Sequence, residues 1–156
     1  MSTENDFDFL AGAWRVSHRR LQRRLAGCDT WDSFSGSCRM WKLLGGFGNV
    51  DDNVLDLPGG SYRAAALRAF DPKTRLWSIW WLDGRTPGPI DPPMVGCFAH
   101  GDGVFEADEL FEGRPIRVRF RWLDTGSEAP RWEQAFSADA GVNWETNWTM
   151  VFARAG

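Results

Sequence analysis

The sequence has little of what metal-binding, disulfide-stabilised or membrane-spanning proteins use. It contains two histidines, one tyrosine and three cysteines, and no C-x-x-C pair occurs among Cys28, Cys38 and Cys97. This argues against structural zinc, and the odd cysteine count fits small buried thiols kept reduced in the cytoplasm. No apolar run is long enough to span a bilayer, and the acidic start MSTENDFDF is unlike a signal peptide.

A strong charge of one sign is also missing. The net charge is −3 and the pI is near 5.4, so no overall field draws the chain to nucleic acid or acidic lipid. Five arginines between positions 15 and 24 form a local basic patch, but aromatic residues do not alternate with them. We interpret this patch as a charged edge strand. We therefore expect no nucleic-acid partner, no membrane partner, and no metal or other cofactor.

Aromatic residues and a two-residue alternation are abundant instead. Ten tryptophans and eleven phenylalanines favour strands, and apolar and polar side chains alternate between most turn signals. The length indicates one domain, residues 1–156, with a sizeable core. The pattern predicts an all-β, antiparallel barrel of nine or ten strands, with a short N-terminal plug formed by Phe7, Phe9 and Leu10.

Two hairpins are specified by their turns. Asp71-Pro72-Lys73-Thr74 joins strands 62–70 and 76–82, and Glu112-Gly113 joins strands 104–111 and 114–123. The second turn predicts a register that sets acid opposite base on one face, so the apolar face of its second strand should point inward. That face comprises Ile116, Val118, Phe120 and Trp122.

Other segments are less regular. Residues 83–94 hold four of the eight prolines and are expected to form a loop, as a lid or a barrel rim. The Asn- and Asp-rich stretch 49–56 is interpreted as an acidic loop, and Gly36 predicts a bulge or bend in its strand.

The last third, residues 131–154, predicts two strands joined by a tight turn. Alternation places Trp132, Gln134, Phe136, Trp144, Thr146, Trp148, Met150 and Phe152 inside, and Arg131, Glu133, Glu145 and Asn147 outside. The turn Ser137-Ala-Asp139-Ala-Gly141-Val-Asn-Trp144 resembles the Asp box of sialidases and other β-proteins. That resemblance implies a folding device, in which Asp139 binds loop N–H groups, Gly141 adopts an unusual backbone angle and Trp144 packs beneath.

The start of the first strand carries a second resemblance. Gly12-Ala13-Trp14 resembles the G-x-W opening of lipocalins and other calycins, where the Trp closes one end of the barrel beneath an Arg of the last strand. The resemblance implies that Arg154 covers Trp14. The order of G-x-W, LGGFGN, FDPKTRLWSIWW and WEQAFSADAGVNWETNW is also similar to a bacterial family of calycin-like proteins of unknown function, which implies a fold but no activity.

Three functions fit this pattern. The first is a barrel that binds a small apolar or aromatic ligand through inward side chains, namely His18, Trp41, Trp81, Trp122, Gln134 and Thr146. The second is an enzyme with an acid–base site in the barrel mouth. It would gain support if the face expected to be outside were buried, namely Arg119, Arg121, Glu133, Glu145 and Asn147. The third is a ligand-free dimer that packs the outer apolar face of residues 76–82. A barrel interior filled by its own aromatic side chains is the alternative to a ligand pocket.

Overall fold

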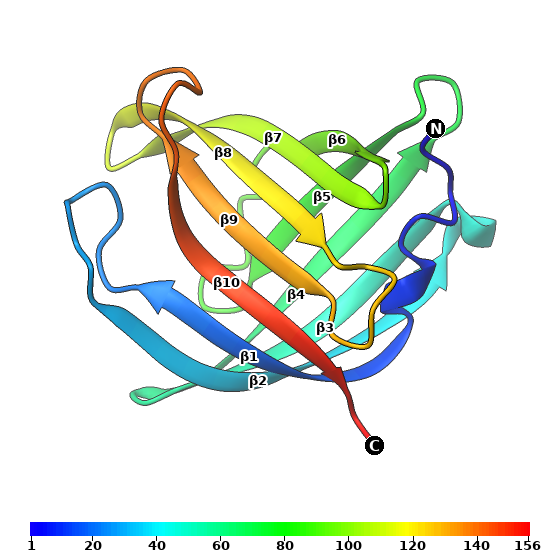
Figure 1. Cartoon of the computed structure of the whole chain (residues 1–156), viewed down its shortest axis with the longest axis horizontal. Helices are drawn as coiled ribbons and strands as arrows, with labels where there is room; N and C mark the ends of the chain where they lie inside the picture. Colours follow the sequence, from blue (N-terminus) through cyan, green and yellow to red (C-terminus); the bar gives the residue numbers. More distant parts are fainter.

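Ten antiparallel strands close into a barrel in the computed structural model, which describes residues 1–156 (Figure 1). The strands are β1 (Gly12–Leu21), β2 (Trp31–Leu43), β3 (Gly48–Leu57), β4 (Gly60–Asp71), β5 (Leu76–Asp83), β6 (Met94–Ala99), β7 (Asp102–Phe111), β8 (Arg114–Leu123), β9 (Arg131–Ser137) and β10 (Glu145–Arg154). Two 3-10 turns, η1 (Asp8–Leu10) and η2 (Leu44–Gly46), complete the elements. Each strand pairs with its neighbours in sequence, and β1 also pairs with β10, so the predicted barrel is confirmed. The interpretation of the arginine-rich segment as an edge strand is wrong, because β1 is hydrogen-bonded on both sides.

The N-terminal segment plugs one end of the barrel, as predicted. Phe7 and Leu10 are fully buried, and the Phe7 ring meets that of Trp77 edge-on with centroids 4.9 Å apart. The Trp14 indole N–H donates to the Leu10 carbonyl over 2.7 Å, and the Arg154 guanidinium lies 3.8 Å from the Trp14 ring centroid. The expected stack between Trp14 and Arg154 is therefore confirmed.

The two predicted hairpins are present with their expected turns. In β7–β8, Phe111 lies opposite Arg114, Asp108 opposite Arg117 and Phe105 opposite Phe120, which is the predicted register. The apolar face of β8 points inward, with Ile116, Val118 and Trp122 buried. The 83–94 segment is a loop over residues 84–93.

The interpretation of residues 49–56 as an acidic loop is wrong. They form most of β3, and Asn49, Asp51 and Asn53 point into the barrel and are buried. Gly36 forms no bulge, because the register of β2 with both neighbours is continuous. A Cβ atom at Gly36 would clash with the Val54 carbonyl oxygen, so glycine at this position permits β2 to lie close to the backbone of β3.

A β-bulge in β10 corrects part of the inside–outside assignment. The pairing with β9 shifts between Thr146 and Trp148, which leaves Asn147 as the extra residue. Trp148, Met150 and Phe152 face inward as predicted, but before the bulge the alternation is reversed. Thr146 pairs with Ala135 on the outer face, and Glu145 pairs with the inward-facing Phe136. Trp144 also lies outside, and Asn147 is buried rather than exposed.

The three cysteines are free thiols. Cys38 is buried inside the barrel, and burial raises the pKa of its thiol, whereas Cys28 and Cys97 are only partly buried. No helix in the structure is long and apolar enough to cross a membrane.

We predict that Arg154→Met destabilises the protein by about 1–3 kcal/mol, because it removes the cation–π stack and two charged hydrogen bonds to the Ala11 and Phe9 carbonyls. Urea unfolding measures the loss. The matched control is Arg15→Met, since Arg15 is an exposed arginine of β1 without such partners. Equal stability of the two variants would contradict the role of Arg154.

Candidate functional site

The N-terminal segment with η1 covers one end of the barrel, here called the closed end, whereas the opposite end, here called the open end, carries only connections between strands. η1 and the C-terminal end of β10 lie at the closed end, while the β1–β2, β7–β8 and β9–β10 connections gather at the opposite end, on the left of Figure 1. The interior carries three indoles, and the Trp148 ring meets the other two, those of Trp81 and Trp132, edge-on. The Trp148 ring lies 5.7 Å from Trp81 and 5.2 Å from Trp132 between centroids.

A cavity of about 30 Å³ lies within the barrel below these indoles. Trp81, Trp122 and Trp132 form part of its apolar wall, and the facing polar wall is formed by β3 and β4. A cavity of this size holds about two water molecules. Apolar walls with a few convergent polar groups are the usual composition of a ligand pocket, but this cavity must widen to admit anything larger.

The polar wall is a hydrogen-bonded network around a buried ion pair. Arg68 and Asp51 join over 2.6 Å, and their side chains are only 6% and 4% exposed. Arg68 Nη1 also donates to Asn49 Oδ1 over 2.9 Å, and Asp51 Oδ1 accepts from the Ala66 backbone N–H and from Asn53. Most of the hydrogen-bonding groups of the pair therefore have partners, but the Arg68 Nε–H group is buried without one.

This network was not predicted, although the chain contains a signal for it. The Pro58-Gly59 turn joins β3 to β4 with Leu57 opposite Gly60. That register sets Asn49 opposite Arg68 and Asp51 opposite Ala66. The small inward side chain of Ala66 leaves room for the Arg68 side chain to reach Asp51.

His18 lies inside the barrel and belongs to the wall near the indoles. Its ring stacks on Phe34 with centroids 4.7 Å apart, and Nδ1 accepts the Trp148 indole N–H over 3.1 Å. Burial lowers the pKa of His18 to about 4; the nearby Arg20 charge adds to this effect and Asp56 opposes it. His18 is therefore neutral at pH 7 and carries its proton on Nε2.

Of the other residues expected to bind a ligand, three face the barrel interior and two lie outside. Trp81 and Trp122 line the cavity. Gln134 faces inward and donates to Asn147 Oδ1 over 2.9 Å. Thr146 lies outside because of the bulge, and Trp41 lies outside because its neighbour Met40 takes the inward position of β2; Trp41 is 46% exposed.

A groove of about 420 Å³ lies at the open end, between the end of β5 and the loop that follows it. It exists because β5 and β6 pair only from Trp77 to Ile79 and then separate. Trp81 lines both this groove and the inner cavity, so the two spaces adjoin at this residue.

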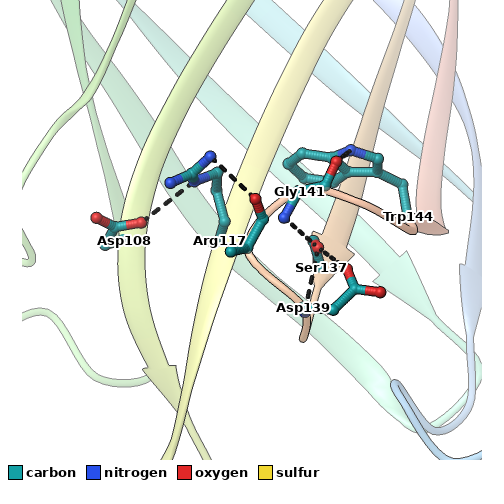
Figure 2. A network of polar contacts seen from close by, with 7 residues as sticks. Asp108, Arg117, Ser137, Asp139, Gly141 and Trp144 are labelled. Carbon is teal, nitrogen blue, oxygen red and sulfur yellow. Dashed lines mark hydrogen bonds and ion pairs between the residues drawn. The ribbon is translucent and has the colours of Figure 1, made fainter.

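The turn between β9 and β10 belongs to the outer surface and not to this site (Figure 2). Asp139 accepts the Asn143 backbone N–H over 2.8 Å, and its contacts with Asn143 and Ser137 lower the pKa of its carboxyl to about 2. Gly141 has φ of 91°, where a side chain would be strained, and Trp144 donates to its carbonyl. Arg117 bridges this turn to Asp108 of β7. These contacts fix a loop and have no catalytic geometry.

No group of three or more His, Cys, Asp or Glu side chains is close enough together to hold a metal ion. The polar side chains that line the cavity are one carboxylate, one guanidinium and one amide, those of Asp51, Arg68 and Asn53, which suit hydrogen bonds with an uncharged polar group.

Comparison with known proteins identifies the fold. No protein-family model and no curated protein matches the sequence. Among solved structures, the S-type phycobiliprotein lyase CPES from Guillardia theta is similar over 100% of this chain and 94% of its own, with a TM-score of 0.66 and 10% sequence identity. The chain is a calycin-like β-barrel. The resemblance to a bacterial family of unknown function stays a prediction.

We predict that His18 makes the stability of this calycin-like barrel dependent on pH. The histidine of the unfolded chain titrates near 6.5, so between pH 6.5 and about 4 only the unfolded state binds its proton. The stabilisation is complete above pH 6.5 and falls by up to about 3 kcal/mol as the pH drops to 4. The difference in unfolding free energy between wild type and His18→Gln should shrink over this interval. A constant difference would contradict the prediction.

We also predict that Arg68→Met costs about 3–5 kcal/mol, because it leaves the Asp51 carboxylate buried without its partner. The double variant Asp51→Leu with Arg68→Met should recover at least half of that loss, since two apolar side chains replace the pair. Urea denaturation of both variants measures this. A double variant less stable than Arg68→Met would show that the ion pair itself stabilises the fold.

Proposed function

We propose that the protein binds a small, mostly apolar or aromatic molecule inside the barrel. The observation that carries the proposal is the cavity itself, with indoles on one wall and the Asp51–Arg68 network on the other. The ligand enters through the groove at the open end and displaces Trp81, and its body packs among Trp132, Trp148 and Phe120. The polar wall then orients one hydrogen-bonding group of the ligand.

The geometry favours binding over acid–base catalysis at the barrel mouth. A general base needs a free lone pair, and the only acceptor nitrogen of neutral His18 is used by Trp148. The Arg119 and Glu133 side chains lie on the outer face, and Glu145 accepts the Leu25 backbone N–H over 2.8 Å. None of these groups lines the inner cavity. A homodimer formed through the outer face of β5 stays a prediction.

The proposal predicts that a neutral aromatic probe, N-phenyl-1-naphthylamine, binds with enhanced fluorescence. Ala66→Val adds two carbon atoms to the cavity wall and should weaken this binding about ten-fold or more. Ala65→Val is the matched control, because Ala65 is the next residue of β4 and faces outward opposite Leu82. Circular dichroism verifies that both variants fold.

Equal effects of the two valine substitutions, or no binding to the wild type, would contradict an internal binding site. Native mass spectrometry of the freshly purified protein adds a second readout. A bound molecule would appear as extra non-covalent mass that disappears in a denatured control, and its mass would identify the ligand.

A further inference from the structure

Two arginines at the open end of the barrel have no carboxylate partner. Arg20 is the last inward-facing arginine of β1, and Arg24 follows in the β1–β2 loop. Neither takes part in any of the seven ion pairs of the structure. Arg85, which stacks on the Tyr62 ring at the same end, is neutralised by Asp83 over 2.7 Å.

Arg20 is held in place by aromatic rings and not by an anion. Its guanidinium carbon lies 5.1 Å from the Trp148 ring centroid and 5.3 Å from that of Phe34. Nη1 donates to the Tyr62 hydroxyl over 3.0 Å, which leaves four of the five N–H donors of Arg20 without a hydrogen-bond partner in the protein and leaves the Tyr62 hydroxyl hydrogen free to donate. The stack fixes the guanidinium above the indoles without cancelling its charge.

Arg24 adds a second cation in a partly dehydrated position. Its Nε is enclosed and has no hydrogen-bond partner. Burial and the neighbouring Arg20 charge lower the pKa of Arg24, although Glu145 opposes them. The Glu145 carboxylate itself is bound to the Leu25 backbone N–H. Two like charges that are partly withdrawn from water are unfavourable unless an anion joins them.

We propose that Arg20 and Arg24, with the Tyr62 hydroxyl, bind the anionic group of an amphipathic ligand, such as a carboxylate. This inference rests on the proposed function, because the apolar body of the same ligand occupies the barrel beneath. The guanidinium of Arg20 lies over the Trp148 ring, which contacts Trp81. A ligand whose anionic group binds Arg20 can therefore extend its apolar body into the indole-lined interior. A forked guanidinium and a hydroxyl donor match the oxygens of an oxyanion.

A matched pair of probes tests this proposal. N-phenyl-1-naphthylamine is neutral, and 8-anilinonaphthalene-1-sulfonate has the same aromatic body with one anionic group. The anionic probe should bind the wild type about ten-fold more tightly in low salt, and the advantage should shrink in high salt. Arg20→Met and Arg24→Met should each remove most of this advantage and change the affinity for the neutral probe by less than about two-fold.

Arg19→Met is the control, because Arg19 lies on the outer face of β1 over the Trp31 ring and should affect neither probe. If Arg20→Met does not fold, Arg24→Met carries the test, since Arg24 lies in a loop. A neutral probe that binds as well as the anionic one would overturn the anion site and leave the proposed function intact. Failure of both probes to bind the folded wild type would overturn both.

Discussion

Closure of the hydrogen-bond ladder between the first and last strands is the constraint on which the rest of the structure depends. β1 pairs with β10 from Trp14 opposite Arg154 to Arg20 opposite Trp148. A closed barrel has no edge strand, and its two-residue alternation assigns every strand one inward set of side chains. The same register therefore sets Arg154 over Trp14 at the closed end and Arg20 over Trp148 at the open end.

Under the proposed function, the ion pair inside this barrel serves recognition more than stability. Apolar side chains of similar volume usually stabilise a core as well as a buried ion pair does. One wall of this barrel nevertheless contains four buried polar side chains, those of Asn49, Asp51, Asn53 and Arg68. The small residues Ala64 and Ala66 pair with Asn53 and Asp51. Arg68 also lies 4.9 Å from the Phe7 ring centroid, so the network joins the cavity to the N-terminal plug. A polar wall that faces indoles is suited to orient a bound molecule.

Much of the fold could be predicted from the sequence wherever a short turn fixes a register, as Glu112-Gly113 does for β7 and β8. Pro58-Gly59 does the same for β3 and β4, but the Asn and Asp content of β3 argues for a loop, because these residues are depleted in strands. The bulge at Asn147 could not be predicted, because the alternation of the β10 sequence continues through it, whereas the structure places Trp144 on the outer face beneath Arg119. Trp41 follows apolar Met40, so alternation alone did not decide which of the two faces inward.

The arginine and lysine side chains at the two ends of the barrel have different partners. This difference sets the orientation in which the proposed ligand would bind. At the closed end, Arg154 donates to two carbonyls and Lys42 pairs with Asp8 over 2.8 Å. At the open end, Arg85 pairs with Asp83, but Arg20 is held only by rings and a phenol oxygen. Because the inner network already balances Arg68 with Asp51, no excess charge remains in the interior. A ligand that presents its charge to the open end and its apolar body to the indoles is therefore complementary in one orientation only.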